Sequence, residues 1–342
     1  MDSPTAQVIK RMATSESAKI SVALPVYNGA DYLREALDSI LAQDFADFEL
    51  VVSDNCSTDE TPAILAEYAA RDARIRVSRT QSLLPQAANV NRSVELCGGD
   101  WVKLFCHDDV MLPGCLRAVR CAIESGGDKV GLVGNGEGWL YANGYFYECP
   151  AGGGVAVALS GTEVVKQTLG GNAAVSLPAL TTATVRKEAW ALGGKFDNRF
   201  AHFDIFLWMR LLMRWDYVAV PEVLTKNRIH GKQIAVGARR SLKSVEDNRL
   251  FWREFLEEFG ADLRLPKATL LRTRLKGMGV AGTTIAIELL KKNATGAVSV
   301  AANVPAHWLP LLPLFVVKSF LSERRRIATL KKYVPVQLIY PG

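Results

Sequence analysis

Two adjacent carboxylates, Asp108 and Asp109, follow His107 directly after the apolar run WVKLF and one cysteine. The run has the length and composition of a buried strand, and a turn at its end needs only one Asp. A second ionised group beside an apolar interior costs several kcal/mol unless its charge is compensated. The pair therefore predicts a bound cation at this point of the chain.

Polar side chains also follow the other apolar runs in the first half of the sequence. Asn28 follows the first run, Asp54 and Asn55 the second, and Arg79 the third. In parallel α/β sheets, ligands bind beyond the carboxyl ends of the strands. These side chains and the two carboxylates are therefore expected along one rim of a sheet, as parts of one site.

The elements that must position these residues alternate between strand and helix. Apolar runs predict strands at residues 20–24, 48–53, 74–78, 101–105 and 129–133, and helical spacing predicts helices from residue 31 and at residues 62–72, 85–97 and 116–123. Ser57 and Glu60 fit a capping box before the second of these helices. The alternation predicts an α/β fold with a mostly parallel sheet flanked by helices.

The pattern becomes less regular after Gly134. Residues 135–154 are rich in glycine and aromatic residues, which indicates hairpins or a mobile loop. Further along, apolar spacing predicts a strand at residues 181–185, an apolar helix at 203–215, a strand at 217–220 and helices within 239–292.

Residues 293–317 contain no charged side chain, although three prolines interrupt the apolar half of this segment. The segment is long enough to span a bilayer, but the prolines break a helix. Basic residues flank it on both sides, which favours interfacial attachment to anionic lipid. Packing on the protein itself or in a homo-oligomer is the alternative that stays open.

The composition of the 342-residue chain, with 49% hydrophobic and 22% charged residues, is that of a soluble globular protein. Residues 1–17 are polar, lack the core of a secretory signal, and are expected to form a flexible leader. The six cysteines show no CxxC pair, which favours free thiols in a reducing cytoplasm. The net charge of +6 is concentrated after residue 238, so an anionic partner, membrane or nucleic acid, is expected there.

Four ordered stretches resemble family-2 glycosyltransferases, in particular those that build bacterial surface polysaccharides. Residues 20–61 (beginning ISVALPVYNG) are similar to the nucleotide-binding half of that family, and residues 89–109 (ending CHDD) to the approach to its DxD metal motif. Residues 193–211 (GGKFDNRFAHFDIFLWMRL) are similar to its base segment, and residues 223–234 (VLTKNRIHGKQI) to the segment that closes its active site. The resemblance implies an inverting enzyme with the Rossmann-like GT-A fold over residues 18–236, followed by a helical C-terminal region over 237–342.

The resemblance also implies a nucleoside-diphosphate sugar donor, most often a UDP-sugar in this family. The positions that match the family's donor site are Pro25, Tyr27, Asn28, Asp54, Asn55, Arg79, Asn89, His107 and Asp108. A turn and a helix cap would explain Asn55 and Ser57 equally well, and surface positions would explain Arg79 and Asn89. Both interpretations stay open at this point.

By the same resemblance, the metal ligands are Asp108, Asp109 and His230, and the cofactor is Mn²⁺ or Mg²⁺. Such ions take oxygen ligands and stabilise the diphosphate that leaves. The first Asp of the usual DxD falls on Cys106, so one expected carboxylate is missing. A structural role for His230 is the alternative.

Asp204 matches the Asp of the family's Glu-Asp base motif, and Phe203 stands at the position of the Glu. The resemblance implies that Asp204 removes a proton from the acceptor hydroxyl. A carboxylate at a helix N-terminus is favourable in any case, which is the structural alternative.

Three other classes of protein compete with this hypothesis. A dehydrogenase is not supported, because the turn PVYNGADY lacks the GxGxxG fingerprint. A nucleic-acid binder has only the basic C-terminal region in its favour, without a motif, so no nucleic-acid partner is expected. A catalytically inactive nucleotide-sugar binding module remains the main alternative. The prediction is a cytoplasmic enzyme, peripheral on the inner membrane, that glycosylates a glycan or lipid-linked glycan.

Overall fold

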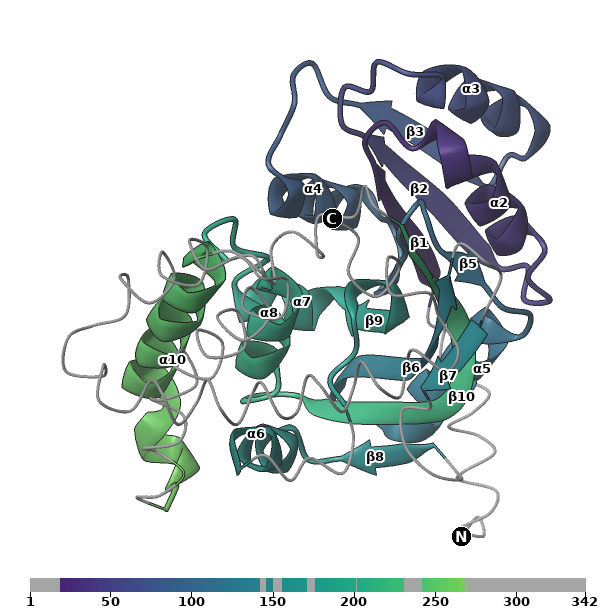
Figure 1. The fold of residues 1–342 in the computed structure, drawn as a ribbon. Coiled ribbons are helices and arrows are strands. Elements are labelled where there is room, and N and C mark those ends of the chain that lie inside the picture. Colours follow the sequence, from purple (N-terminus) through teal and green to yellow (C-terminus); the bar gives the residue numbers. More distant parts are fainter. Residues whose placement is uncertain are drawn as a thin grey trace, which may run out of the picture.

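The computed structural model of the protein describes residues 19–141, 146–149, 156–170, 176–200, 202–230, 242–266 and 269. A single sheet runs through this part of the chain, with helices on both of its faces (Figure 1). The strand order is β3-β2-β1-β4-β9-β6-β10-β5, with β7 paired to β6 and β8 paired to β10. The α/β fold class predicted from the sequence is confirmed.

The first half of the sheet is parallel. Its strands are β1 (Ile20–Val26), β2 (Phe48–Asp54), β3 (Ile75–Arg79) and β4 (Trp101–Leu104). The helices between and after them are α2 (Ala30–Leu41), α3 (Thr61–Arg71), α4 (Gln86–Leu96) and α5 (Cys115–Gly126). All of these elements lie close to the ranges expected from the sequence.

The second half of the sheet mixes the two strand directions. β9 (Ala183–Arg186) runs antiparallel between β4 and β6 (Val130–Tyr141), whereas β6 is parallel to β10 (Asp216–Ile229). Three short strands pair antiparallel at the margins: β5 (Val110–Met111), β7 (Phe146–Cys149) and β8 (Val157–Leu159). The β6–β7 pair is a hairpin of the kind expected within residues 135–154. Parallel pairing therefore holds across the first four strands, and β9 reverses the direction beside them.

The remaining helices are α6 (Gly161–Gly170), the 3₁₀ turn η1 (Leu180–Thr182), α7 (Lys187–Gly193), α8 (Phe203–Leu211) and α10 (Leu242–Leu263). The predicted capping box before α3 is wrong, because the helix begins at Thr61 and Ser57 lies four residues before it. The Ser57 hydroxyl instead accepts the backbone N–H of Asn28, and Asp59 accepts the backbone N–H of Thr61.

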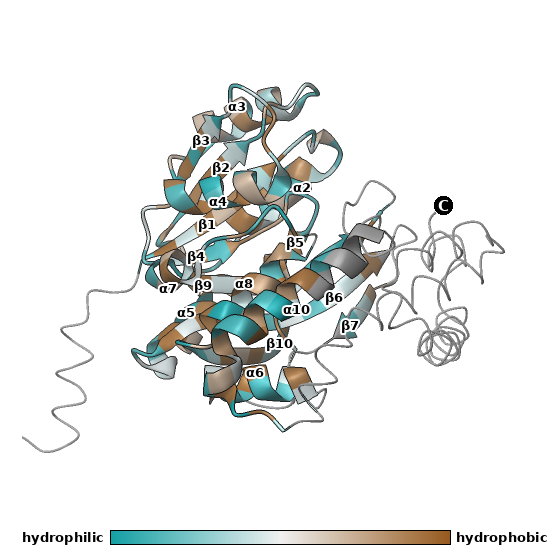
Figure 2. Ribbon diagram, turned by 90° about the vertical axis from the view of Figure 1, so that its left-hand side faces the viewer, coloured by the Kyte–Doolittle hydropathy of each residue, from teal (hydrophilic) through white to brown (hydrophobic). Residues whose placement is uncertain are grey.

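Two hydrophobic cores cover the two faces of the sheet. One contains the inner faces of α2, α3 and α5, and the other contains those of α4, α6, α7, α8 and α10. α10 has one hydrophobic and one hydrophilic side (Figure 2), and its Phe251 stacks on Phe206 of α8 with ring centroids 3.9 Å apart. α10 lies after residue 236, yet it shares a core with the elements that precede that residue.

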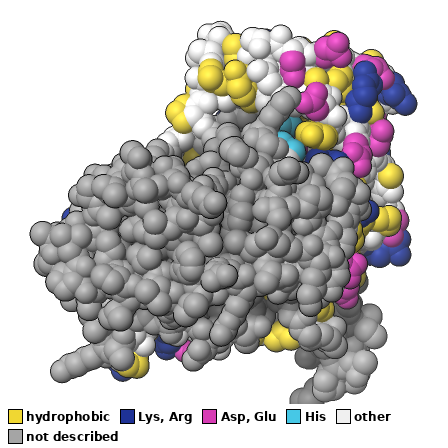
Figure 3. Space-filling model, viewed as in Figure 1, with side chains coloured by type: hydrophobic (Ala, Val, Ile, Leu, Met, Phe, Trp, Pro, Cys, Tyr) yellow, Lys and Arg dark blue, Asp and Glu magenta, His cyan; other side chains and the backbone are white. Residues whose placement is uncertain are grey.

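The outer surface of α2 and α3 carries acidic and basic side chains intermixed (Figure 3). Glu67 of α3 makes ion pairs with Arg34 of α2 and with Arg71 on its own helix. In this view the N-terminal half of the molecule presents both signs of charge rather than a uniformly basic face.

Two predicted segments lie outside the part of the chain that the structure describes. These are the leader at 1–17 and the apolar segment at 293–317. In the part of the chain that the structure describes, no helix is long and apolar enough to cross a membrane. Cys56, Cys97, Cys106, Cys115 and Cys121 are free cysteines, as expected from their spacing.

Candidate active site

The acidic turn, residues 106–109, connects the end of β4 to the start of β5. Its backbone closes through the Asp109 N–H, which donates to the Cys106 carbonyl over 3.3 Å. One ligand atom from each of Cys106, Asp108 and Asp109 lies within 4.8 Å of the other two. The sequence prediction that two carboxylates gather at the end of this strand is consistent with this placement, and the thiol of Cys106 joins them.

Asp108 forms an ion pair with His230, with 2.9 Å between Oδ2 and Nε2. Burial by itself raises the pKa of the Asp108 carboxyl, but the hydrogen bond with His230 and the charges of His107 and His230 outweigh it and hold that pKa below its ordinary value. Asp108 lies in the turn after β4 and His230 directly follows β10, so the two come from segments far apart in the sequence. The structure therefore gathers all three residues expected at the metal around Asp108, with Asp109 in the same turn and His230 at 2.9 Å.

Asp109 points into the protein and is 5% exposed. Its Oδ1 accepts the backbone N–H of Arg228 at 2.9 Å, which fastens the acidic turn to β10. Burial raises the pKa of this carboxyl well above its ordinary value, and the neighbouring charge of Asp108 adds to the shift. Asp109 is thus a buried support for the turn, and Asp108 is the more accessible carboxylate.

Two side chains of α2, Tyr32 and Glu35, contact residues at the end of β10. Neither of them was identified as a site residue from the sequence. The Arg228 guanidinium donates from Nε to the Asp108 carbonyl at 3.0 Å and pairs with Glu35. It also lies over the ring of Tyr32, whose centroid is 4.9 Å from that of His230. Helical spacing placed Tyr32 and Glu35 on α2 but gave no sign of their partners, because those partners lie about two hundred residues away.

His107 packs against Gly29 in the loop after β1. A Cβ at position 29 would lie 2.4 Å from His107 Cδ2 and 2.7 Å from a methyl of Val26, so a side chain there has no room. Burial lowers the pKa of His107, although the charge of Asp108 and a hydrogen bond with the backbone of Pro25 act in the opposite direction. His107 therefore joins the acidic turn to the loop that the sequence assigned to the nucleotide.

That loop is fixed by a reciprocal contact between the ends of β1 and β2. Asn28 has a φ of +48°, its backbone N–H donates to Ser57 Oγ at 2.9 Å, and its Oδ1 accepts the N–H of Thr58 at 2.8 Å. A short polar side chain such as asparagine tolerates this left-handed conformation. Tyr27, next to it, is 44% exposed and faces solvent.

Asp54 closes the same rim at the end of β2. One carboxylate oxygen accepts the N–H of Ser57 at 3.0 Å, and the other lies 3.5 Å from Nη1 of Arg79. The Arg79 side chain is 46% exposed, and its Nη2 also donates to the Ser57 carbonyl at 2.7 Å. Asp54, Arg79 and the loop around Asn28 thus form one connected edge beyond the parallel strands.

The side chains of Asn55 and Asn89 face the interior, which argues against the donor contacts expected from the sequence. Each is 4% exposed. Asn55 accepts the N–H of Leu84 and donates to its carbonyl, both at 2.9 Å, and so holds the loop before α4. Asn89 accepts the Ser53 hydroxyl at 2.7 Å and donates to the Ser53 carbonyl, which ties α4 to β2. A ligand would have to replace these bonds, and unmade buried hydrogen bonds are costly.

Asp204 stands in the first turn of α8, where the helix dipole favours its charge. One carboxylate oxygen accepts the N–H of Ile205 at 2.9 Å. Burial raises the pKa of the Cys106 thiol well above its ordinary value, and Asp109, Asp108 and Asp204 add to the shift. The charge of Asp204 is thus felt at Cys106 of the acidic turn.

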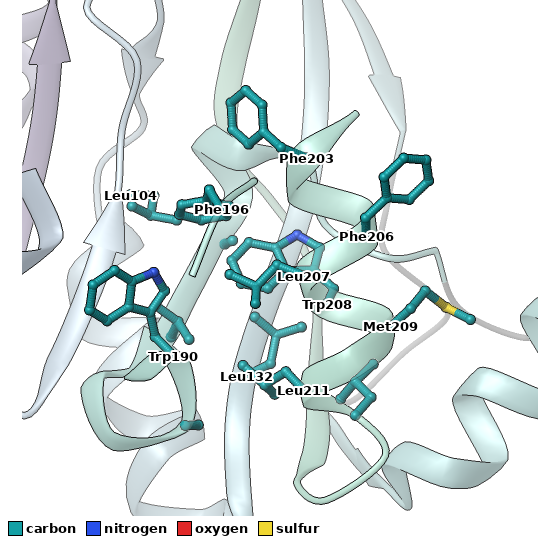
Figure 4. Close-up of a cluster of buried hydrophobic side chains, with 14 of the residues drawn as sticks. Leu104, Leu132, Trp190, Phe196, Phe203, Phe206, Leu207, Trp208, Met209 and Leu211 are labelled. Atoms are coloured by element: carbon teal, nitrogen blue, oxygen red, sulfur yellow. The ribbon is translucent and has the colours of Figure 1, made fainter. Parts of the chain in front are cut away.

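Phe203, at the position of the family's Glu, turns into the hydrophobic core. It is 7% exposed, and its ring meets Phe196 edge-on with centroids 5.4 Å apart. Figure 4 shows the same cluster, with Trp208 and Leu207 of α8 beneath these two rings. The first turn of α8 thus carries one carboxylate and is anchored by the neighbouring aromatic ring.

The donor set of the acidic turn fits a divalent cation. It offers carboxylate oxygens of Asp108 and Asp109, the imidazole of His230 and the thiol of Cys106. Carboxylate oxygens suit both Mn²⁺ and Mg²⁺, whereas imidazole and thiol ligands suit later transition ions such as Zn²⁺. The side chain best placed to bind first is Asp108, because Asp109 already accepts the Arg228 N–H.

An α/β sheet with an acidic turn beyond β4, and a second carboxylate at the start of α8, is the arrangement of a GT-A glycosyltransferase. Residues 21–135 match the family described as glycosyl transferase family 2. This match covers the parallel half of the sheet and the start of β6, and the described part of the chain has the GT-A fold.

Curated relatives support this assignment. The chain is 26% identical over 247 residues to an uncharacterized glycosyltransferase of Rickettsia prowazekii, covering 71% of this chain and 73% of the relative. It is 33% identical over 109 residues to the GalNAc(5)-diNAcBac-PP-undecaprenol beta-1,3-glucosyltransferase of Campylobacter jejuni, covering 32% and 35%. An uncharacterized protein of Sinorhizobium fredii, y4gI, is 37% identical over 108 residues, which are 31% of this chain and 12% of that protein. The chain thus spans only a part of several relatives.

Solved structures share the fold at low sequence identity. TarS residues 1–349 of S. aureus in complex with UDP-GlcNAc superposes with a TM-score of 0.63 at 18% identity, covering 88% of both chains. The mannosyltransferase PcManGT of Pyrobaculum calidifontis, in complex with GDP-Man and Mn²⁺, gives a TM-score of 0.53 at 16% identity and covers 93% of this chain and 92% of its own.

Proposed function

We propose that this protein transfers a sugar from a nucleoside-diphosphate donor to a hydroxyl of a glycan or lipid-linked glycan, with inversion at the anomeric carbon. The donor is a UDP-sugar in this proposal, and a divalent cation, Mn²⁺ or Mg²⁺, binds at Asp108. Pro25, Tyr27, Asp54 and Arg79 line the nucleotide side. One relative is named for a polyprenyl-diphosphate-linked acceptor, which supports the lipid-linked class.

The observation that supports this proposal is the pair formed by a carboxylate in the acidic turn, Asp108, and a carboxylate at the start of α8, Asp204. Asp108 sits beyond β4 with His230, and Asp204 begins α8 close enough to interact electrostatically with Cys106 of the same turn. Inverting transfer needs positive charge at the leaving diphosphate, which a cation held by Asp108 would supply, and one base for the acceptor hydroxyl, the role proposed for Asp204.

In the proposed reaction, the Asp204 carboxylate takes the proton of the acceptor hydroxyl. The freed oxygen attacks the anomeric carbon in line, and the bond to the diphosphate breaks. A cation at Asp108 would stabilise the negative charge that accumulates on the leaving diphosphate. Arg79, half-exposed at the rim, would orient the nucleotide through its base.

The experiment is a screen of UDP- and GDP-sugars for hydrolysis and transfer, with Mn²⁺, with Mg²⁺ and with a chelator. We expect turnover with one donor class and loss of turnover with the chelator. Asp204→Asn is nearly isosteric and should leave donor affinity unchanged while turnover falls about 10²-fold or more. Asp128→Asn, an exposed carboxylate, is the matched control and should behave as wild type.

Wild-type turnover in Asp204→Asn would remove the assignment of the base. Donor binding without hydrolysis or transfer for any sugar would favour an inactive nucleotide-sugar binding module, in line with the replacements at Cys106 and Phe203.

A further inference from the structure

Lys103 is a charged side chain inside the strand that delivers the acidic turn. It lies on β4, three residues before Cys106, and is 0% exposed. Removing an ammonium group from water is expensive unless hydrogen bonds or an opposite charge compensate it. A lysine at this point of an apolar strand therefore needs a specific set of partners.

Its partners are neutral oxygen atoms of the turn before β9 and of β6. Lys103 Nζ donates to the Thr181 carbonyl at 2.8 Å and to Asn135 Oδ1 at 3.0 Å. Among the described residues, no carboxylate lies within ion-pair distance of Lys103. The side chain thus acts as a hydrogen-bonding bridge between β4, the turn before β9, and β6.

The bridge continues from Lys103 to the acidic turn through Thr181. The Thr181 hydroxyl accepts the Cys106 N–H at 3.4 Å and makes a hydrogen bond with the Asp109 carboxylate. Thr181 is itself 2% exposed, so water does not replace these contacts. Fixing the Thr181 backbone by Lys103 therefore fixes the hydroxyl that holds both ends of the turn.

The other arm of the bridge reaches β10. Asn135 donates to the Thr225 hydroxyl at 3.3 Å, and β10 carries Arg228, whose N–H holds Asp109. Buried polar networks whose members are all bonded define one geometry, because any displaced member leaves a group unpaired. Both supports of Asp109, the Thr181 hydroxyl and the Arg228 N–H, thus belong to elements that Lys103 ties together.

We propose that Lys103 is a positioning residue for the metal-binding turn, acting through Thr181 and Asn135 to hold Cys106 and Asp109 in place. The inference rests on the proposed function, because the turn is the metal site of that proposal. Its role differs from that of the ligands, since Lys103 Nζ bonds to the Thr181 carbonyl and Asn135 Oδ1 rather than to a side chain of the acidic turn.

The test uses Lys103→Met, which keeps the length of the side chain and removes its hydrogen bonds. Its control is Lys129→Met, a lysine with 70% of its side chain exposed. Mn²⁺ affinity is measured by electron paramagnetic resonance, with UDP present. Residues that orient metal ligands change metal affinity by about 10- to 100-fold, so we expect a loss of that size in Lys103→Met and none in Lys129→Met.

The direction in which the Mn²⁺ affinity changes in Lys103→Met distinguishes a positioning role from simple charge repulsion. Removing a positive charge near a cation site would tighten Mn²⁺ binding, whereas loosening the turn weakens it. Tighter or unchanged Mn²⁺ binding in Lys103→Met would overturn the positioning role.

A second pair of variants keeps the test decisive if Lys103→Met does not fold. Thr181→Val preserves the shape and removes the hydroxyl, so it should weaken Mn²⁺ binding by a similar factor. Thr181→Ser keeps the hydroxyl and should restore most of the affinity. Equal affinity in Thr181→Val and wild type would overturn the proposal.

A readout without metal distinguishes this inference from the proposed function. The rate at which a maleimide modifies Cys106, measured by peptide mass spectrometry with exposed Cys121 as the internal reference, reports opening of the turn. We expect the modification rate to increase about tenfold in Lys103→Met and in Thr181→Val. A loss of about 1.4 kcal/mol in the local stability of the turn would raise the population of its open form by that factor. If wild type binds no Mn²⁺ but these rates rise, the positioning role stands and the metal assignment fails. Unchanged rates in both variants would overturn the positioning role.

Discussion

Replacing Phe251 by alanine tests whether α10 is an integral part of the catalytic unit. Phe251 is 2% exposed and stacks on Phe206 of α8 with an interplanar angle of 8°, and Phe200 meets its ring edge-on. Truncation of a buried phenylalanine costs about 3–5 kcal/mol, as lost transfer free energy and an unfilled cavity. Folded domains are stable by about 5–15 kcal/mol, so Phe251→Ala should remove a large part of the free energy of unfolding.

The assay is urea unfolding followed by circular dichroism and tryptophan fluorescence. Glu257→Ala, an exposed position on the same helix, is the matched control and should change stability by less than about 0.5 kcal/mol. Phe206 lies two residues after Asp204, so the folded fraction of Phe251→Ala should also turn over more slowly than wild type. A destabilisation below about 1 kcal/mol would refute the reasoning, because such a loss is typical of a surface substitution.

Three further predictions concern the metal site, the pH dependence and the C-terminal segment. Asp108→Ala should abolish the Mn²⁺-dependent part of UDP binding in calorimetry while leaving the thermal unfolding curve cooperative, and UDP affinity that still responds to Mn²⁺ would contradict the assignment. Burial raises the pKa of Glu49, but hydrogen bonds from donors that include Ser21 and Gly98 outweigh it, so the net shift is downward from 4.5. The stability that Glu49 contributes is therefore present at neutral pH and is lost as the pH falls below that value, and Glu49→Gln should flatten the acid limb of a plot of melting temperature against pH; an unchanged limb would count against it. A chain ending at Lys292 should lose binding to anionic liposomes at low salt but keep donor hydrolysis, and full-length protein that ignores such liposomes would favour the oligomer interpretation.

The parallel strands and the acidic turn could be predicted because their signals are local. Each strand is a short apolar run that ends at a polar residue, and the rule for the carboxyl ends of parallel strands then gathers those residues at one rim. The predicted strand at 217–220 was too short by comparison with β10, which continues to Ile229. Pro221 lies inside this strand, where it would normally end one, and the register shift between Val220 and Val223 accommodates it.

The partners of asparagine and lysine side chains could not be predicted in the same way. Asn55 and Asn89 stand at positions that suit a ligand, but both turn inward to backbone groups of other elements. Lys103 lies within an apolar run and gives no periodic signal, because its acceptors come from residues more than thirty positions away. Such choices depend on which backbone groups the fold leaves unpaired, and that is a property of the tertiary structure.

The contact between Gly29 and His107 has a consequence for how this site varies among homologous sequences. The φ of Gly29 is −99°, so its backbone is open to any residue and only space excludes a side chain. A homologue with alanine at position 29 should therefore carry a smaller residue than histidine at position 107, and the two replacements should be acquired together. The nucleotide loop and the acidic turn would then diverge as a linked pair, although seventy-eight positions of sequence separate them.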